Sequence, residues 1–533
     1  MKVVIAEKMS PRATDLLREP TWDVVTPEQL NGNLPAQLET ADALIVRSAV
    51  QVNGDLLQHA KKLRVIGRAG VGVDNIDLEA ATRAGIAVMN TPGANAVAVA
   101  EQTIGVMLAM ARHLARANTL MHAGRWEKKS LQGTELRGKT LGIVGLGRVG
   151  MEVARRARAF GMELVGHDPF ISTSIAKEQG IRMASLDELY AVADYLTLHV
   201  GLTSQTAGMI NPKSIMKMKR GVRLVNCARG ELVDEAALAE ALKEGAVGGA
   251  ALDVFVEEPL KNSPFTGLDN VILTPHIGGS TNEAQEAVGY QIAQQVKEYL
   301  KDGVIQNAVN VPSLSHDEYV ELQPYIVLAE RLGAFLAQVS DGSLVEISLR
   351  YSGHVAEGKT ELIRNAAIKG ILNHQGLEEK ANLVNAASMA ASRGLPVHEA
   401  KKAKTSGSTE SVISLLLKTS REEHIVKGSV IHKAVPRLMH VDGIDVEAPL
   451  ETNLIYMRNN DVPGVIGRVG TILGEQKINI ANFSLGRRVG RPNSGEPNEA
   501  IAVVHVDGRV PDKVLDELKK VPAVRQAKAI LLL

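Results

Sequence analysis

Short apolar runs alternate with segments of helical periodicity through about the first 300 residues of the chain. Runs such as "KVVIA", "LGIVGLG" and "VRLVNC" are typical of buried strands, and "MEVARRARAF" and "EAALAEALKEG" are typical of the helices between them. Repeated strand–helix–strand units build parallel sheets with helices on both faces. This rhythm therefore predicts an α/β fold with two doubly wound, Rossmann-like parallel sheets, whose ligands bind at the carboxyl ends of the strands.

The pattern changes twice in the remainder of the chain. From about residue 312 it becomes a less regular α+β unit, and after Pro449 it follows the order β-α-β-β-α-β, which is typical of a ferredoxin-like domain. The predicted units are a first lobe over 1–97 that is completed by 283–311, a second α/β domain over 98–282, an intervening domain over 312–450, and a C-terminal domain over 451–533.

Composition narrows the class of function. The 60 Lys and Arg residues balance the 60 Asp and Glu residues, so we expect no nucleic-acid or membrane partner. The single cysteine, Cys227, excludes an internal disulfide and suits a reducing compartment. Cys/His zinc spacing is absent, and the uncharged stretches 84–100 and 195–212 contain Pro, Gly and Asn. We expect a soluble, cytoplasmic chain without a metal.

The segment "LGIVGLGRVGMEVARRARAFGMELVGHD" predicts a dinucleotide site. Gly145, Gly147 and Gly150 form GxGxxG between a strand and a helix, and Asp168 ends the next strand. The glycines allow a tight turn, close approach of the pyrophosphate and helix–sheet packing, and the Asp168 carboxylate favours NAD over NADP. A tight turn without a ligand is the alternative. The other candidate cofactor contacts are Arg148, Val149, Cys227 and Asp253.

Three polar groups at later strand ends suggest chemistry on a hydroxy acid. Arg229 can hold a carboxylate bidentately, and His276 can take a hydroxyl proton. Glu258, next to such a histidine, would orient it and favour its protonated form. His199 is a rival for the base and Glu257 a rival for Glu258, and spacing alone leaves both choices open.

Four segments in order, "GIVGLGRVG", "LVNCARGELVDEAAL", "ALDVFVEEP" and "LTPHIGGST", resemble the D-2-hydroxyacid dehydrogenases over roughly the first 310 residues. The resemblance implies NAD-dependent oxidation of a D-2-hydroxy acid. It also implies that Arg229 binds the substrate carboxylate, Glu258 tunes the base, and His276 rather than His199 is the acid/base.

Two further arginines suggest an anionic substrate tail. Arg47 and Arg68 each end a strand, and two cations that face one cleft favour an anion. The segments "VRSAVQV", "GRAGVGVDNIDLEAAT", "MNTPGANAVAVAE" and "GRWEKKSLQGTEL" resemble the members of this family that oxidise 3-phosphoglycerate at the start of the phosphorylated route to serine. The substrate contacts expected on these grounds are Arg47, Arg68, Gly70, Val71, Asn95 and Lys128.

The C-terminal segment "RNNDVPGVIGRVGTILGEQKINIANFSL" resembles an ACT domain, a small amino-acid-sensing module. The resemblance implies that Asn459, Asp461 and Asn479 bind L-serine as an effector across a pair of such domains. A dimerisation module that binds nothing is the alternative. The hairpin over 486–500 is longer than this family pattern leads us to expect. Together with an apolar helix expected over 96–121, this domain predicts a homodimer or homotetramer.

Two other functions remain open. The chain could oxidise a different D-2-hydroxy acid, such as glycerate or 2-hydroxyglutarate, or it could be an NAD-sensing scaffold without activity. The pair Arg47 and Arg68 and the C-terminal sensor domain disfavour a substrate with a small uncharged tail, and the presence of all three reacting groups disfavours the scaffold.

Overall fold

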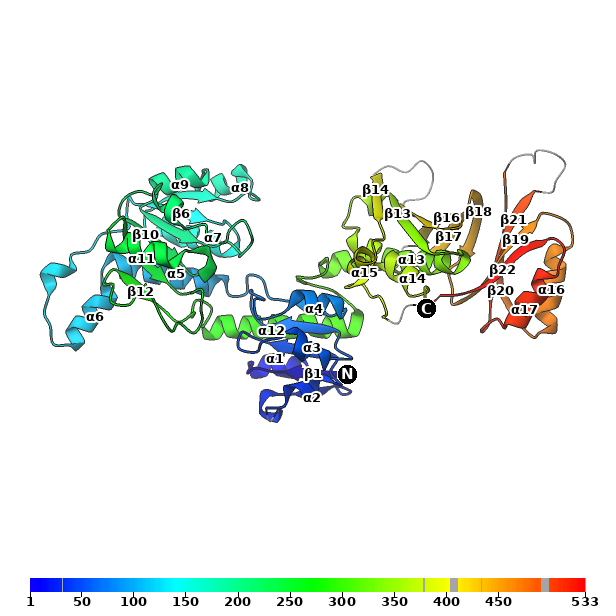
Figure 1. Ribbon diagram of the computed structural model, residues 1–533, viewed down its shortest axis with the longest axis horizontal. Coiled ribbons are helices and arrows are strands. Elements are labelled where there is room, and N and C mark those ends of the chain that lie inside the picture. The colour runs from blue at the N-terminus through cyan, green and yellow to red at the C-terminus, as the bar shows by residue number, and fades with distance from the viewer. Residues whose placement is uncertain (31, 377–378, 403–410, 433, 490–497, 533) are drawn as a thin grey trace.

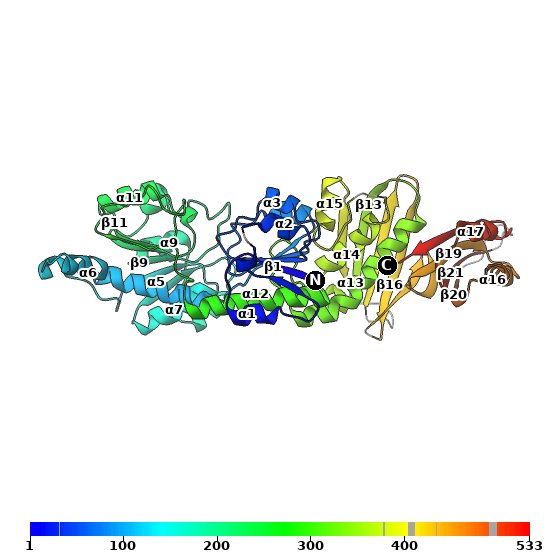
Figure 2. The ribbon, with the colours of Figure 1, turned by 90° about the horizontal axis from the view of Figure 1, so that it is seen from below.

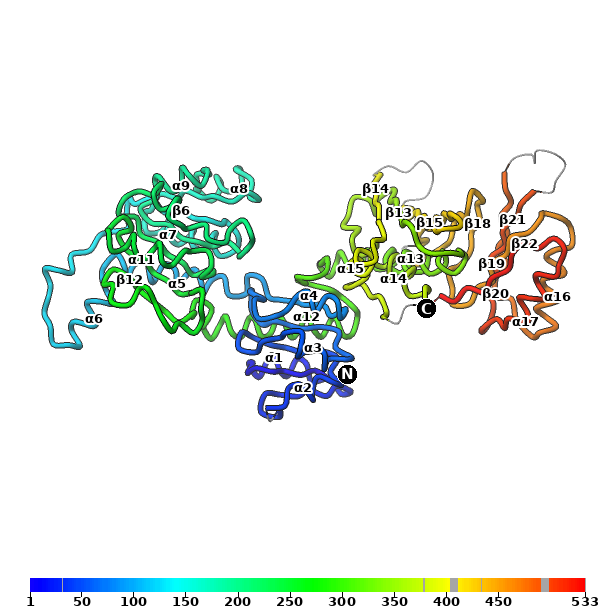
Figure 3. Tube along the Cα trace, in the orientation of Figure 1, coloured from blue at the N-terminus to red at the C-terminus, as the bar shows by residue number. Residues whose placement is uncertain are grey.

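The computed structural model describes residues 1–30, 32–376, 379–402, 411–432, 434–489 and 498–532. Four units lie in a row, with the second α/β domain at one end and the C-terminal domain at the other (Figure 1). The chain leaves the N-terminal lobe, builds the neighbouring α/β domain, and returns through one long helix before it continues to the intervening domain (Figure 3).

The N-terminal lobe contains a five-stranded parallel sheet of order β2-β1-β3-β4-β5. Every residue of its central strand Ala43–Val46 is buried, because helices cover both faces of the sheet. Its strands are β1 (Lys2–Ile5), β2 (Asp23–Val25), β3 (Ala43–Val46), β4 (Val65–Arg68) and β5 (Ala87–Met89). Its helices are α1 (Pro11–Leu16), η1 (Pro27–Gln29), α2 (Leu34–Leu38), α3 (Gly54–Gln58) and α4 (Leu78–Arg83).

The second domain contains a seven-stranded parallel sheet of order β12-β11-β10-β9-β6-β7-β8. The strand order reverses direction at β6, which follows the pattern of a doubly wound sheet. Its strands are β6 (Thr140–Val144), β7 (Glu163–His167), β8 (Arg182–Met183), β9 (Tyr195–Leu198), β10 (Val222–Asn226), β11 (Val247–Leu252) and β12 (Val271–Leu273). Its helices include α7 (Arg148–Ala159), α8 (Thr173–Glu178), α9 (Leu186–Val192), α10 (Pro212–Ile215), η3 (Gly230–Leu232) and α11 (Glu235–Lys243). The predicted pair of parallel sheets is confirmed.

The apolar helix expected over 96–121 is two helices, so that prediction was wrong in its length. Helix α5 (Ala96–Ala111) is largely buried, whereas α6 (Leu114–His122) buries only Leu120 and projects from the end of the domain, followed by η2 (Lys128–Leu131) (Figure 1). The break lies at His113, which has a left-handed φ of 51°. The Thr134 N–H donates to the Ala111 carbonyl at 2.9 Å, so the returning chain satisfies a carbonyl at the C-terminal end of α5.

Helix α12 (Asn282–Asp302) carries the chain back to the N-terminal lobe, where it packs beside α1 (Figure 2). Beyond it, the Asn310 side chain accepts from the Val88 N–H at 2.9 Å and donates to the Ile86 carbonyl at 2.9 Å, which ties the returning segment to β5. Val304, Ile305, Val311, Leu314 and Tyr319 belong to the same apolar cluster, which continues from the N-terminal lobe into the intervening domain.

The intervening domain is a six-stranded mixed sheet of order β14-β13-β15-β16-β17-β18, in which only β13 and β14 run parallel. Helices α13 and α14 pack on one another against it. Its strands are β13 (Leu344–Gly353), β14 (Val397–Lys402), β15 (Ser411–Thr419), β16 (Glu423–Ile431), β17 (Val435–Val441) and β18 (Ile444–Pro449). Its helices are α13 (His316–Val339), η4 (His354–Ala356), α14 (Glu361–Leu372) and α15 (Ala386–Ser392).

The C-terminal domain has the predicted ferredoxin-like order, with an antiparallel sheet of order β20-β21-β19-β22. The Tyr456 ring packs edge-on against Phe335 of α13, with ring centroids 5.6 Å apart, and so joins this domain to the intervening one. Its elements are β19 (Asn453–Asn460), α16 (Val465–Glu475), β20 (Ile480–Arg487), β21 (Glu499–Val506), α17 (Asp512–Lys519) and β22 (Val524–Leu531). The central part of the long hairpin, residues 490–497, lies outside the described residues.

Candidate active site

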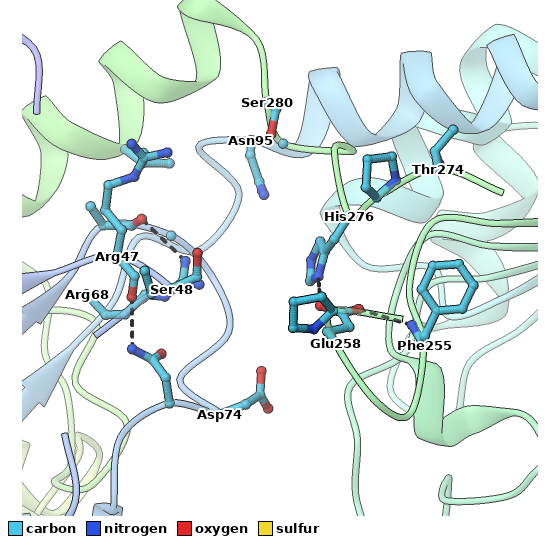
Figure 4. A pocket seen from close by; sticks show the side chains of 18 of the residues that line it. Arg47, Ser48, Arg68, Asp74, Asn95, Phe255, Glu258, Thr274, His276 and Ser280 are labelled. Carbon is cyan, nitrogen blue, oxygen red and sulfur yellow. Dashed lines mark hydrogen bonds and ion pairs between the residues drawn. The ribbon is translucent and has the colours of Figure 1, made fainter. Parts of the chain in front are cut away.

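Strand ends of the two parallel sheets face each other across a cleft of about 1170 Å³. Arg47, Arg68 and Asp74 line the wall that belongs to the N-terminal lobe, and Glu258 and His276 line the opposite wall (Figure 4). This is the place where a doubly wound sheet is expected to bind its ligand. The structure thus brings together groups that are separated by up to about 230 residues of sequence.

His276 and Glu258 form a hydrogen-bonded pair on the second domain's wall. Nδ1 of His276 lies 2.6 Å from Oε2 of Glu258, and Oε1 of Glu258 accepts from the Phe255 N–H at 3.0 Å. His276 has a left-handed φ of 53°, a conformation that costs energy in a non-glycine residue and is concentrated at functional sites. Its side chain is 51% exposed, so the ring nitrogen that does not face Glu258 is open to the cleft.

Asp253 is a buried support for this pair. It accepts from Thr274 Oγ1 at 2.5 Å, from the Ile277 N–H at 2.9 Å and from the Gly278 N–H at 2.7 Å. Both of its carboxylate oxygens therefore hold the turn that carries His276. A contact between Asp253 and the nicotinamide carboxamide stays a prediction.

The two rivals lie elsewhere. His199 follows β9 and its Nε2 lies 2.9 Å from Thr197 Oγ1, while desolvation lowers the pKa of His199 to about 4 and keeps its imidazole neutral. Glu257 faces Lys261, with Oε1 3.7 Å from Nζ. Neither residue belongs to the lining of the cleft among the described residues. The cleft therefore favours His276 and Glu258.

Arg47 and Arg68 present cations to the cleft without a carboxylate partner among the residues that the structure describes. The Nε of Arg68 is buried and has no hydrogen-bond acceptor, and Nη1 reaches only the Ala69 carbonyl at 3.3 Å. Desolvation, and then the nearby charge of Arg229, lower the pKa of Arg68. Arg47 donates to Gln285 and to the Lys8 carbonyl. Partly buried cations without counter-ions are costly, so this wall suits an anionic ligand.

Arg229 follows β10, and its side chain reaches across to the N-terminal lobe. Its Nε donates to Oδ2 of Asp74 at 3.0 Å, and its Nη1 donates to the Ala228 carbonyl at 2.6 Å. The side chain of Arg229 is 26% exposed, and Arg229 is not among the described residues that line the cleft, although its partner Asp74 is. The two walls are thus linked by one ion pair.

Of the other expected substrate contacts, some lie at or beside the cleft and one lies away from it. The Gly70 N–H donates to the Arg68 carbonyl at 2.9 Å, and any side chain at Gly70 would collide with the Arg68 guanidinium. The neighbouring Val71 is 38% exposed. Asn95 lines the cleft with a buried Oδ1 that lacks a donor. Helix α6 and η2 form an arm over residues 114–131 that projects from the domain. Lys128 lies on this projecting arm and, within the described part of the chain, does not line the cleft.

The GxGxxG loop has the shape that a dinucleotide needs. Gly145 has a φ of 93°, and a Cβ there would lie 2.5 Å from the His199 carbonyl oxygen. A Cβ on Gly150 would lie 2.0 Å from the Gly145 carbonyl oxygen, whereas one on Gly147 would point into open space. The loop therefore leaves room above Gly147 at the start of α7, where backbone N–H groups can meet a pyrophosphate.

The residues around this loop have defined partners. Asp168 accepts from the Leu146 N–H at 2.8 Å and from the Phe170 N–H at 2.8 Å, which fixes it at the end of β7. Arg148 donates to the Pro92 carbonyl and packs on Gly93, so it bridges the two domains. Of the remaining candidates, Val149 lies in the first turn of α7 and is partly buried, and Cys227 follows β10. Burial, followed by the charge of Asp253, raises the pKa of the Cys227 thiol to about 12. These surroundings fit NAD.

The three expected serine contacts do not meet within one chain. Asn459 and Asp461 lie where β19 ends, and Asn479 precedes β20 at the opposite end of the sheet, since Ile480 pairs with Val506 and Asn460 with Glu499. An eight-residue strand of about 25 Å separates the two ends. Asn459 has a buried Oδ1 without a donor, and Asp461 lies 3.2 Å from Nε of Arg487.

Several contributors at this cleft were missed by sequence reasoning. Gln285, near the start of α12, binds Arg47 and also donates to the Gly279 carbonyl at 2.7 Å. Glu7 accepts from the backbone N–H groups of Arg47, Ala49 and Val50 and so fixes the loop that carries Arg47. These partners are distant in sequence, and no local signal identifies them. Within the described ranges, no helix could cross a membrane and no cluster of metal-binding side chains occurs.

Three family profiles match the chain in order. "D-isomer specific 2-hydroxyacid dehydrogenase, NAD binding domain" matches residues 104–278, "D-3-phosphoglycerate dehydrogenase intervening domain" matches residues 321–442, and "ACT domain" matches residues 454–523. The succession of units agrees with the fold.

Relatives match the chain over nearly its whole length. The D-3-phosphoglycerate dehydrogenase of Methanocaldococcus jannaschii is 41% identical over 99% of this chain and 99% of its own length. That of Synechocystis is 38% identical over 100% of this chain and 95% of its own length. Among solved structures, a glyoxylate reductase from Paecilomyes thermophila matches with a TM-score of 0.53 and 32% identity, over 58% of this chain and 98% of that one.

Proposed function

The chain belongs to the D-3-phosphoglycerate dehydrogenases, and we propose that its cleft oxidises 3-phospho-D-glycerate to 3-phosphohydroxypyruvate with NAD. The protein is an NAD-dependent oxidoreductase. The observation that supports this substrate is the pair Arg47 and Arg68 on the wall opposite His276. Both are cations without carboxylate partners among the described residues. A substrate with a carboxylate and a phosphate would match Arg229, beside the lining residue Asp74, together with Arg47 and Arg68, which line the cleft.

Gly145, Gly147 and Asp168 would hold NAD, which would supply the hydride acceptor when bound. Glu258 accepts a hydrogen bond from Nδ1 of His276, which leaves Nε2 unprotonated and able to take the hydroxyl proton. Arg229 binds the carboxylate and so fixes carbon 2 relative to the base. Asp253 keeps the turn of His276 rigid through three hydrogen bonds. Closure of the two walls would exclude water from the reacting atoms.

The distal end of the cleft would bind the phosphate. Arg68, partly desolvated, and Arg47, held by Gln285, can both donate charge-assisted hydrogen bonds to phosphate oxygens. Gly70 borders the same end, but its N–H already donates to the Arg68 carbonyl, so the backbone N–H offered to the phosphate would be that of the neighbouring Val71. Asn95 could donate near the carboxylate. Lys128 would reach a cleft only in a neighbouring subunit, because it lies on the projecting arm.

The C-terminal domain would bind L-serine as a feedback inhibitor. Asn459 and Asp461 lie at the opposite end of the sheet from Asn479, so a complete set of contacts requires two such domains side by side. This requirement, with the exposed apolar residues of the arm such as Leu114, Met121 and Trp126, supports a homodimer or homotetramer. The single Cys227 is compatible with a cytoplasmic location.

The deciding measurement is NADH formation from 3-phosphoglycerate, with D-glycerate as a parallel substrate and L-serine added to each. Turnover of phosphoglycerate with a much lower KM than D-glycerate would support the phosphate site, and suppression by serine would support the effector site. Equal use of D-glycerate would contradict the phosphate assignment. Turnover of neither substrate would favour a scaffold, and turnover indifferent to serine would remove the inhibitor from the proposal.

A further inference from the structure

Asp74 is the acidic partner of Arg229, and the two belong to different walls of the cleft. Asp74 lies in the loop after β4 of the N-terminal lobe, and Arg229 follows β10 of the second domain, 155 residues later. Their Nε–Oδ2 distance is 3.0 Å, and the side chain of Asp74 is 65% exposed. Arg47 and Arg68, the other cleft arginines, form no such ion pair within the described residues.

Asp74 occupies a part of Arg229 that a bound carboxylate needs. A guanidinium grips a carboxylate through two neighbouring N–H groups, and the edge made of Nε and Nη2 is one of the two that allow this. Asp74 takes Nε on that edge. Nη1, at the other edge, donates to the Ala228 carbonyl, and the backbone at Gly72 lies so close that a Cβ there would be 1.9 Å from Nη2.

The two bonds differ in how easily they can be released. The Ala228 carbonyl belongs to the residue that precedes Arg229, so it moves with the arginine. Asp74 is an exposed side chain that can rotate into water, where its carboxylate is solvated. A second carboxylate at the same guanidinium would repel Asp74. An incoming carboxylate would therefore displace Asp74 and leave the Ala228 bond intact.

We propose that the Asp74 carboxylate stands in for the substrate carboxylate at Arg229 in the open cleft, and that it is displaced when a 2-hydroxy acid binds. This inference rests on the proposed role of Arg229 as the carboxylate site. Asp74 is then a positioning residue that acts through Arg229. It keeps the guanidinium in place before binding, and it lowers the apparent affinity for substrate by the fraction of time that it holds Arg229.

The test is Asp74→Asn, with Asp77→Asn as a matched control. Asp77 is in the same loop, caps α4 and can be replaced by Asn with the cap retained, so the control removes one negative charge without touching Arg229. The expected result for Asp74→Asn is a KM for 3-phosphoglycerate and for D-glycerate that falls about two- to fivefold, with kcat within about twofold of the parent. Asp77→Asn should leave both constants unchanged, and Asp74→Glu should keep a parent-like KM because the carboxylate is retained.

A readout without turnover is the dissociation constant of oxalate, measured by calorimetry on the NAD-saturated full-length protein. Oxalate should bind Asp74→Asn more tightly by the same factor as the substrates. In an Arg229→Lys background, which removes Nε, the effect of Asp74→Asn should disappear, because the two residues act as one unit.

The outcomes separate the two proposals. If Arg229→Lys raises KM but Asp74→Asn raises or does not change it, Asp74 merely orients Arg229 and this inference is overturned while the carboxylate site stands. If Arg229→Lys changes neither KM nor oxalate binding, the carboxylate site is wrong and the inference falls with it. A gain in affinity in Asp77→Asn equal to that in Asp74→Asn would reduce the effect to loop charge and would also overturn it.

Discussion

Replacing Arg68 by glutamine should remove recognition of the phosphate while leaving the chemistry of carbon 2 intact. Arg68 lies on the wall opposite His276, and its guanidinium is partly desolvated without a carboxylate partner among the described residues. A phosphate that binds there gains charge-assisted hydrogen bonds and neutralises a costly cation. D-glycerate has the same carboxylate and hydroxyl groups but no phosphate, so it measures the remainder of the site.

The size of the effect follows from the surroundings of Arg68. A hydrogen bond to a charged group contributes about 1.5–3 kcal/mol, which corresponds to about 10- to 150-fold in kcat/KM. Because Arg68 is partly desolvated, the upper half of this range is expected for 3-phosphoglycerate. The value of kcat/KM for D-glycerate should change less than about threefold, because no bond to that substrate is lost. The melting temperature should stay level or rise, since a desolvated cation is removed.

The assay is NADH formation with each substrate over a range of concentrations, for the parent, Arg68→Gln and Arg64→Gln. Arg64 precedes the same strand β4, at the end away from the cleft, and its guanidinium lies over the Tyr299 ring, so this control loses one positive charge without altering the site. An equal loss of kcat/KM for both substrates in Arg68→Gln would refute a phosphate-specific role. A similar loss in Arg64→Gln would attribute the effect to overall charge.

Four other substitutions have definite expected outcomes. His276→Gln should lower kcat by about 10²- to 10⁴-fold with NAD affinity retained, measured by steady-state kinetics and cofactor titration, and loss of NAD binding would contradict the role of a base. Gly150→Ala should lower both the melting temperature and NAD affinity, because its Cβ would lie 2.0 Å from the Gly145 carbonyl oxygen, whereas Gly147→Ala, whose Cβ meets open space, should lower NAD affinity alone. The hydrogen bond from Nδ1 to Asp442 at 2.7 Å raises the pKa of His424, so this ion pair stabilises the fold below about pH 6.5 and is lost as pH rises through the raised value. The urea midpoint of His424→Gln should therefore differ most from the parent near roughly pH 6 and least near roughly pH 9, and a difference that grows with pH would contradict this account.

The sequence by itself was sufficient for the features that depend on local pattern. The alternation of apolar runs and helical periodicity determined two parallel sheets, and the strand order of the C-terminal domain followed from its β-α-β-β-α-β pattern. The GxGxxG spacing located a turn at which the neighbouring backbone leaves no room for a Cβ on Gly145 or Gly150. These are short-range effects of backbone sterics and side-chain periodicity, so a window of a few residues contains the necessary information.

Local pattern was insufficient for two other features. The apolar stretch over 96–121 reads as one helix, yet the chain breaks at His113, because the Ala111 carbonyl accepts a hydrogen bond from Thr134, more than twenty residues later. Asn459 and Asn479 share one motif in the sequence and lie at opposite ends of the sheet, since antiparallel pairing rather than sequence distance sets their separation.

Only the tertiary structure decided which polar groups share the cleft. Fourteen histidines occur in the chain, and His199 and His276 both follow apolar strands. His199 is desolvated and does not line the cleft among the described residues, whereas His276 lines it opposite Arg47 and Arg68. Nothing in the sequence identified Asp74, because its partner Arg229 follows 155 residues later in another domain. These residues become neighbours because folding places strand ends of two sheets opposite each other. Contacts between residues so far apart in sequence cannot be predicted from local periodicity.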